Sequence, residues 1–319
     1  MSIVLPGGTT ISQFGFGCSG LMARLNRKES RRLLETAFDH GITHYDVARC
    51  YGYGEAESVV GDFIEGRRSA VTVTTKAGIL PPRKTKLLAT ARGIARRVVG
   101  IHPMFRRRLR AMTRTMSSFG CFDVATIQQS VETSLRELRI DVIDFLLLHD
   151  CTPDDLSNPE LLEYLTALQK AGKIRQFGVG TGFAEAAQAR QIYPALTQVV
   201  QFANGPWQPN MLNAEWTAGL TVFTHSAVGP AFAKIRPALA ADSVLAARWS
   251  SQLGFDAKDS RKLGEAFLGA ALAANSKGCV LFPTQRPEAI ATNVKIAPRP
   301  DLWLTLCALA KTIPGHAPA

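Results

Sequence analysis

Short apolar runs alternate along the chain with longer segments in which apolar residues recur every three or four positions. The short runs predict strands and the periodic segments predict amphipathic helices. The predicted strands are Gln13–Gly17, Thr43–Asp46, Val71–Lys76, Val142–His149, Ile174–Val179, Gln198–Phe202, Thr221–His225 and Cys279–Pro283. The predicted helices are Lys28–His40, Gly54–Glu65, Ala125–Leu138, Asn158–Lys170, Phe183–Gln191, Asn210–Thr217, Arg261–Ala274, Pro287–Val294 and Pro300–Lys311.

This alternation predicts an α/β protein of one domain. Eight strand–helix repeats in 319 residues favour a (β/α)8 TIM barrel over an open doubly wound sheet. The early turn LPGGTT predicts a small hairpin that closes one end of the domain. No G-x-G-x-x-G follows an early strand, so the pattern does not favour a Rossmann fold. Because we find neither internal repeats nor a linker, we expect residues 1–319 to form a single domain.

One segment carries the whole net charge of +11. Residues 79–122, which follow the third predicted strand, contain eleven Arg and Lys residues and no Asp or Glu, while the rest of the chain is balanced. Within this basic insertion Phe105, Leu109, Met112 and Met116 recur at helical spacing, which predicts an amphipathic basic helix. The insertion is either a solvated surface segment or a cationic flap that favours an anionic ligand. Nucleic-acid binding is not favoured, because the segment matches none of the usual recognition modules.

The composition excludes several other classes of protein. With 46% apolar and 20% charged residues, the chain has the balance of a soluble globular protein. It contains no run of roughly 20 uncharged apolar residues that would span a membrane. The N-terminus lacks the pattern of a secretory signal, and the six cysteines are far apart without metal-ligand spacing. We therefore expect a cytoplasmic protein with reduced thiols, no membrane span and no metal site.

Four polar residues fall at or just beyond the ends of consecutive predicted strands. Asp46, Lys76 and His149 end the second, third and fourth strands, and Tyr51 follows Asp46 by five residues. Reactive groups of a TIM barrel project from this rim, so these four side chains are expected to converge.

A carboxylate, a phenol, an ammonium and an imidazole together are suited to deliver a proton to a carbonyl oxygen. We expect Tyr51 to be the general acid, with Lys76 lowering its pKa and Asp46 keeping the ammonium charged. His149 would donate a hydrogen bond to the same oxygen. The set supplies no electrons, which favours a hydride cofactor. Two alternatives remain: a Schiff-base lyase with Lys76 as nucleophile, and a catalytically idle barrel that acts through the basic insertion.

Several stretches resemble the aldo-keto reductase family. They are GITHYDVARCYGYGEAESVVGDFI, TVTTKAG and SVETSLRELRIDVIDFLLLHD, followed in order by GKIRQFGVG, VVQFANGPW, THSAVGPA and VLFPTQRPEAIATNV. The resemblance covers nearly the whole chain except the basic insertion and the tail. It implies a TIM barrel with NADP(H) or NAD(H) bound across the rim, and a reaction with an aldehyde, a ketone or, in reverse, a sugar-type alcohol.

The resemblance also implies a set of binding residues. Gln201 matches the glutamine that contacts the nicotinamide carboxamide, and Trp207 lies where an aromatic residue would line the substrate pocket. Gly180-Thr181 stands where the family commonly has Ser-Asn, and His225 stands where an aromatic residue, often Tyr, stacks on the nicotinamide. The implied cofactor-binding residues are Gly180, Gln201, His225, Ser226, Val228, Arg286 and Asn293.

Overall fold

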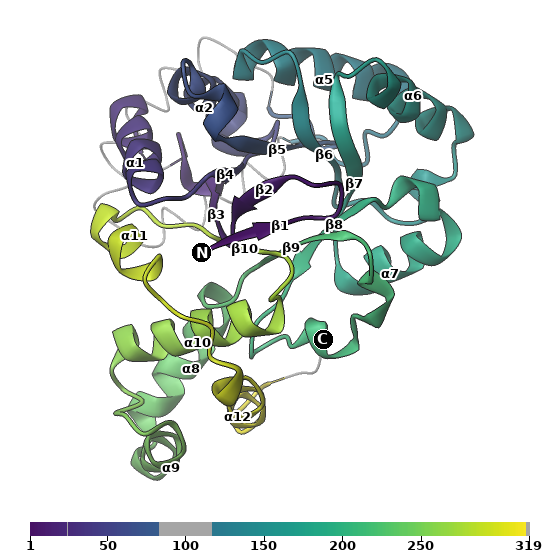
Figure 1. The fold of residues 1–319 in the computed structure, drawn as a ribbon. Helices are drawn as coiled ribbons and strands as arrows, with labels where there is room; N and C mark the ends of the chain where they lie inside the picture. The colour runs from purple at the N-terminus through teal and green to yellow at the C-terminus, as the bar shows by residue number, and fades with distance from the viewer. Residues whose placement is uncertain (24, 83–116, 317–319) are drawn as a thin grey trace.

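The computed structural model describes residues 1–23, 25–82 and 117–316, and eight parallel strands in this part of the chain form a closed barrel (Figure 1). The order around the barrel is β10-β3-β4-β5-β6-β7-β8-β9, with β9 pairing back to β10. The (β/α)8 prediction is therefore confirmed. The strands are β3 Phe14–Gly17, β4 His44–Asp46, β5 Thr72–Ala77, β6 Ile143–His149, β7 Ile174–Gly180, β8 Val199–Ala203, β9 Thr221–His225 and β10 Cys279–Phe282.

Helices surround the barrel. Their starts are set by local capping: Asn26 and Glu29 form a capping box at α1, and the Asp123 carboxylate accepts from the backbone of Thr126 at the start of α5. The helices are α1 Arg27–Asp39, α2 Ala56–Ile64, α5 Val124–Leu138, α6 Pro159–Lys170, α7 Phe183–Ile192, α8 Gly229–Ala241, α9 Ser243–Leu253, α10 Ser260–Ala274, α11 Pro287–Asn293 and α12 Pro300–Ala310. None of the described helices is long and apolar enough to cross a membrane.

A hairpin covers the N-terminal end of the barrel, as the LPGGTT turn predicts (Figure 1). Its strands are β1 Ser2–Val4 and β2 Thr10–Ser12, which pair antiparallel. Leu5 and Ile11 from this hairpin are buried against inward-facing side chains of the barrel strands. Gln176 on β7 and Thr221 on β9 also donate to the Pro6 carbonyl of the hairpin turn, so this end of the barrel is closed by both apolar packing and hydrogen bonds.

The helix predicted over Asn210–Thr217 is wrong. The segment forms two short 3-10 turns, Asn210–Asn213 and Glu215–Thr217. The Asn210 side chain donates to the Ala203 carbonyl at 2.8 Å, and the Met211 amide donates to the Asn204 side chain at 3.0 Å. These contacts with the end of β8 replace the hydrogen bonds of a continuous helix.

Two helices, α8 and α9, are absent from the sequence prediction. The sequence pattern predicts no helix between Thr221–His225 and Arg261–Ala274, yet α8 begins at Gly229 and α9 follows at Ser243. Pro237 lies inside α8, and proline ordinarily ends a helix because its ring clashes with the preceding turn. Burial against neighbouring helices offsets this cost, since Ala231, Ile235 and Leu239 are all buried in one apolar cluster.

The basic insertion begins and ends beside β5. The Leu80 amide donates to the Ser118 carbonyl at 2.9 Å, and the Cys121 amide donates to the Gly78 carbonyl at 3.0 Å. The two ends therefore meet at the rim where β5 ends. The helix predicted from Phe105, Leu109, Met112 and Met116 lies outside the described residues.

Candidate active site

The carboxyl ends of the barrel strands bring the four predicted catalytic residues to one rim. Asp46 ends β4, Lys76 is the penultimate residue of β5, and His149 ends β6. Together with Tyr51, which lies just beyond β4, they line a groove of about 1300 Å³. The expected convergence is what the structure shows, because neighbouring parallel strands end at the same level.

Lys76 and Asp46 form a buried ion pair. The Lys76 ammonium donates to both carboxylate oxygens of Asp46, at 2.7 and 2.8 Å, and to the Val47 carbonyl at 3.2 Å. Their exposed fractions are 3% and 5%. Burial lowers the pKa of Lys76, but the Asp46 carboxylate more than offsets this and raises it above its ordinary value. Lys76 is therefore a fixed positive charge at neutral pH.

Tyr51 is held over this charge by a short loop. The Arg49 amide donates to the Lys76 carbonyl at 3.3 Å, and the Tyr51 amide donates to the Ala48 carbonyl at 3.0 Å. Gly52 then turns the chain with a φ of 57°, at a point where a Cβ would lie 2.7 Å from the Leu21 carbonyl oxygen. The Lys76 ammonium ends up 5.1 Å from the centroid of the Tyr51 ring.

The net pKa of Tyr51 differs from the sequence prediction. Burial raises the pKa of the phenol, and the charge and hydrogen bonding of Lys76 lower it; the balance raises it to about 12. Lys76 lowers the pKa of Tyr51 as expected, but it does not bring that pKa below its ordinary value, because desolvation outweighs the ammonium. Tyr51 is protonated at neutral pH and can act as a proton donor.

His149 faces Tyr51 across the groove. The two rings meet edge to face with centroids 5.9 Å apart. Burial, followed by the positive charge of Lys76 and the nearby His225, lowers the pKa of His149 to about 3. The imidazole is therefore neutral over the physiological range, and one of its ring nitrogens carries a hydrogen that it can donate.

This low pKa predicts a pH dependence of folding stability. The unfolded chain protonates His149 below about pH 6.5, whereas the folded chain does so only near pH 3. The free energy of unfolding should fall as pH decreases through this window, with His149 contributing a slope of about 1.4 kcal/mol per pH unit. Urea unfolding of His149→Asn should show that slope removed. His40→Asn, at an exposed histidine outside the groove, is the control, and an unchanged slope in His149→Asn would contradict the assignment.

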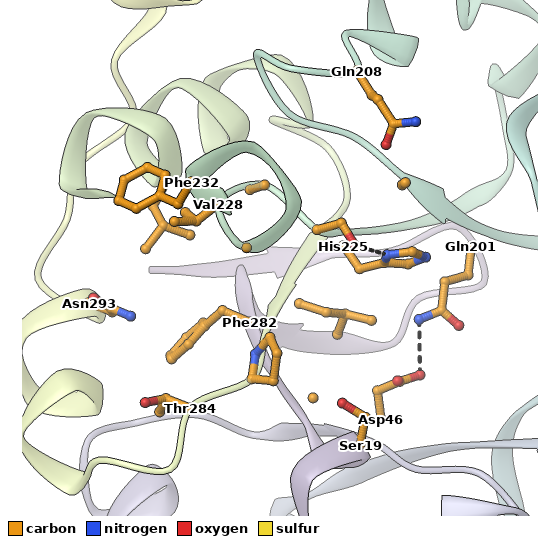
Figure 2. Close-up of a pocket in the computed structure, with 18 of the residues that line it drawn as sticks. Ser19, Asp46, Gln201, Gln208, His225, Val228, Phe232, Phe282, Thr284 and Asn293 are labelled. Carbon is orange, nitrogen blue, oxygen red and sulfur yellow. Dashed lines mark hydrogen bonds between the residues drawn. The ribbon is translucent and has the colours of Figure 1, made fainter. Parts of the chain in front are cut away.

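Gln201 joins the Lys76–Asp46 ion pair to the rest of the groove. Its Nε2 donates to Asp46 Oδ1 at 3.1 Å (Figure 2), while its buried Oε1 has no hydrogen-bond partner. A Cβ at Gly180 would lie 3.3 Å from that same oxygen, so glycine leaves it uncovered. An unpaired buried carbonyl is unfavourable, which makes Oε1 a ready acceptor for a ligand donor.

The neighbouring predicted cofactor residues also line the groove. His225, at the end of β9, lies beside Gln201, and its Nδ1 is 2.8 Å from the Ser226 hydroxyl (Figure 2). Val228 precedes α8, whose first turn carries backbone N–H groups at Gly229 and Ala231 but none at Pro230. Thr181 also lines the groove, but its hydroxyl donates to the Cys151 carbonyl at 2.8 Å.

Arg286, directly before α11, and Asn293, the last residue of α11, lie at the far end of the groove. Figure 2 shows Asn293 and Phe232 near this end, with Phe282 between Asn293 and Asp46. The groove is therefore long enough to connect α11 with the catalytic rim.

The structure does not place Trp207 in the groove. A tight turn follows β8, in which Gly205 and Gln208 exchange backbone hydrogen bonds at 3.1 and 3.0 Å. Gln208 lines the groove, whereas the Trp207 indole packs against the ring of His316, with the two ring centroids 4.5 Å apart. We therefore do not include Trp207 in the proposed substrate site.

Sequence analysis missed several groove residues. Phe232 belongs to α8, which was not predicted, while Phe282 and Thr284 are apolar or small polar residues without a distinctive pattern. Cys50, which is not one of the groove-lining residues, was also missed, although its place directly before Tyr51 was a usable signal; its Sγ lies 3.9 Å from His149 Nδ1. Within the described residues, no group of three or more His, Cys, Asp or Glu side chains could hold a metal ion.

The sequence matches the model of the Aldo/keto reductase family over residues 13–220. The chain belongs to this family. Among the curated aldo/keto reductase relatives, D-threo-aldose 1-dehydrogenase of a Pseudomonas species is 30% identical over 190 residues, which cover 56% of this chain and 53% of that protein. Pyridoxal 4-dehydrogenase of Microbacterium luteolum is 28% identical, covering 54% and 53%. This aldo/keto reductase chain spans about half the length of the curated relatives it matches.

Solved structures of the family share the fold. An aldo-keto reductase of Bacillus halodurans in its holo form has a TM-score of 0.72 with 19% identity, covering 100% of this chain and 97% of that one. An aldo-keto reductase of Klebsiella pneumoniae in complex with NADPH has a TM-score of 0.65 with 18% identity, covering 100% and 96%. At these identities the similarity supports the barrel of this aldo/keto reductase rather than a particular substrate.

Proposed function

We propose that this protein is an NAD(P)(H)-dependent oxidoreductase that reduces an aldehyde or ketone, or oxidises a sugar-type alcohol in the reverse direction. The observation that carries the proposal is the position of Tyr51, beside the Lys76–Asp46 ion pair and opposite the neutral His149. The catalytic roles of these four residues are part of the proposal. The proteins named above as dehydrogenases, and the relative crystallised with NADPH, support the same chemistry.

The groove fits a nicotinamide cofactor. The unpaired Gln201 Oε1 would accept from the carboxamide of the nicotinamide, next to the gap left by Gly180. His225 and Ser226 would lie beside the ring, and the backbone amides that follow Val228 would face the pyrophosphate. Arg286 and Asn293 would hold the adenosine end. The same residues can serve NADP(H) or NAD(H).

When bound, the cofactor supplies the hydride for the carbonyl carbon. The residues of this chain protonate and orient the carbonyl oxygen. Tyr51, protonated at neutral pH, donates its phenolic proton to the oxygen as negative charge develops there. Lys76 stabilises the resulting phenolate, and Asp46 holds the ammonium in place. His149 donates a hydrogen bond that orients the carbonyl.

The two alternative functions receive less support. A Schiff-base lyase needs Lys76 as a neutral amine, but its pKa is raised and Asp46 holds it charged. An idle barrel that acts only through the basic insertion would have no need of the ordered Asp46, Tyr51, Lys76 and His149 set.

Spectrophotometric turnover with NADPH and NADH, in both directions, tests the proposal. The carbonyl panel should include neutral aldoses, their phosphorylated forms and aromatic aldehydes. We expect cofactor-dependent reduction of at least one class. Failure of both cofactors with every class, together with borohydride trapping of a substrate on Lys76, would instead support the lyase.

Gln201→Leu tests the cofactor site directly. The leucine lacks the carbonyl acceptor, so the Kd for NADPH should rise about five- to tenfold, the effect of one lost hydrogen bond. Isothermal titration would measure it. The control ligand is 2′-phospho-ADP-ribose, which lacks nicotinamide and should bind the variant and the wild type equally. Equal weakening of both ligands would contradict the proposed contact.

The basic insertion supports a preference for an anionic carbonyl substrate. Eleven basic residues and no acidic ones lie between residues 79 and 122. The triple variant Arg106→Glu/Arg107→Glu/Arg108→Glu should have a raised KM for phosphorylated aldehydes and an unchanged KM for neutral aldehydes. Steady-state assays at low and high ionic strength would measure this. Equal effects on both substrate types would contradict the preference.

A further inference from the structure

We propose that Cys50 is a positioning residue: its thiol donates a hydrogen bond to Nδ1 of His149 and thereby fixes the tautomer in which Nε2 carries the hydrogen. This inference rests on the proposed function, because it assigns His149 as a donor to the carbonyl oxygen. Cys50 lies in the loop after β4 and His149 at the end of β6, so the two residues are 99 positions apart in sequence. In the structure the distance from Cys50 Sγ to His149 Nδ1 is only 3.9 Å.

The position of the thiol is set by the loop that also holds Tyr51. Arg49, the residue before Cys50, is fixed by its backbone bond to Lys76 and by an ion pair from its guanidinium to the buried Glu57 at 3.0 Å. Glu57 in turn accepts from the Thr75 hydroxyl on β5 at 2.7 Å. Arg49 is therefore anchored to β5, while the amide of Tyr51, on the other side of Cys50, donates to the Ala48 carbonyl within the loop. These contacts restrict the backbone on both sides of the thiol.

The chemistry of the two groups decides the direction of the hydrogen bond. A neutral imidazole has one nitrogen that donates and one that accepts. Burial raises the pKa of Cys50 to about 11, so the thiol keeps its hydrogen at neutral pH. A ring nitrogen is a stronger acceptor than a thiol sulfur, so the S–H group donates into the lone pair of Nδ1.

The surroundings keep both groups neutral. Lys76 is the charged neighbour common to Cys50 and His149; His225 also faces His149, and Asp150 and Glu57 face Cys50. The Lys76 ammonium opposes protonation of the imidazole, while burial opposes ionisation of the thiol.

With Nδ1 occupied, Nε2 is the nitrogen left to serve the groove. In the tautomer that Cys50 favours it carries a hydrogen and can donate to a carbonyl oxygen. In the opposite tautomer Nε2 would present a lone pair to that oxygen and repel it. Cys50 thus favours the form of His149 that stabilises charge on the reacting oxygen.

The tautomer can be measured without any turnover. Long-range ¹H–¹⁵N correlation spectra of ¹⁵N-histidine-labelled protein distinguish a protonated from an unprotonated ring nitrogen, and His149→Asn identifies the His149 signals. We expect wild-type His149 to be the Nε2–H tautomer. Cys50→Ala should shift it toward a mixture of the two tautomers. Cys50→Ser, whose hydroxyl is also a donor, should retain the wild-type form.

Kinetics provide the second readout. Cys50→Ala should lower kcat for carbonyl reduction about three- to tenfold, the range expected when one hydrogen bond is lost, with the Kd for NADPH unchanged. Cys50→Ser should recover most of kcat. Cys307→Ala, which removes a buried thiol in α12 on the outside of the barrel, is the matched control and should retain wild-type kcat.

An Nδ1–H tautomer in the wild-type protein would overturn the proposal. So would a folded Cys50→Ala variant with an unchanged tautomer, or a loss of kcat that Cys50→Ser shares in full. If no carbonyl is reduced but the spectra show the expected tautomers, the proposed function fails while the thiol–imidazole contact stands. The two failures are therefore distinguishable.

Discussion

Replacing Tyr51 with phenylalanine is expected to lower kcat/KM for carbonyl reduction by about 10²- to 10⁴-fold, the range that general acid catalysis contributes. The variant keeps the ring that contacts Lys76 and His149 but loses the proton that the reduced oxygen needs. Steady-state rates with the best carbonyl of the screen would measure the effect.

Cofactor affinity separates this chemical loss from misfolding. The Kd of Tyr51→Phe for NADPH should equal that of the wild type, because Gln201 and the far end of the groove are untouched. Tyr53→Phe, two positions along the same turn and outside the described groove-lining residues, is the matched control. A Tyr51→Phe variant with wild-type turnover would contradict the assignment of the general acid.

Lys76→Met should be costly to both folding and activity. It leaves the Asp46 carboxylate buried without its cation, and breaking a buried ion pair in this way costs about 3–5 kcal/mol of unfolding free energy. The pKa of Tyr51 should also rise further, since Lys76 is the group that lowers it. Urea unfolding and carbonyl reduction assays would measure the two effects.

The double variant Asp46→Asn/Lys76→Met distinguishes these contributions. It removes both charges and keeps an oxygen that can accept from Gln201 Nε2. Most of the lost stability should return because no unpaired charge remains, while the activity should stay low because Tyr51 still lacks its ammonium. A double variant as unstable as Lys76→Met would show that the cost is not electrostatic.

The convergence of Asp46, Lys76 and His149 at one rim was predictable because its signals are local. Buried parallel strands appear as short apolar runs, and the polar residue that interrupts each run marks the rim, as His149 does after FLLL. Asp46 and Lys76 are charged residues at the ends of the less apolar segments HYD and TVTTKA, so their signal is the charge at the strand end rather than the end of an apolar run. Once the barrel is inferred, the order of its strands places these three side chains next to each other.

Other features depend on long-range packing that one sequence does not reveal. The pKa of Tyr51 is the balance between enclosure by the groove and the charge of Lys76, and only the folded structure gives the size of each. The contact between Cys50 and His149 joins residues from two different strand ends. The position of Trp207 depends on the turn after β8 and on His316 near the end of the described chain.

Deuterium transfer tests the central claim most directly. NADPH carrying deuterium at the transferable position of the nicotinamide would be incubated with the protein and an accepted aldehyde, and the product analysed by mass spectrometry. The account predicts an alcohol with deuterium on the former carbonyl carbon, formed by the wild type and lost in Tyr51→Phe. An unlabelled product, or the same labelled yield from Tyr51→Phe, would contradict it.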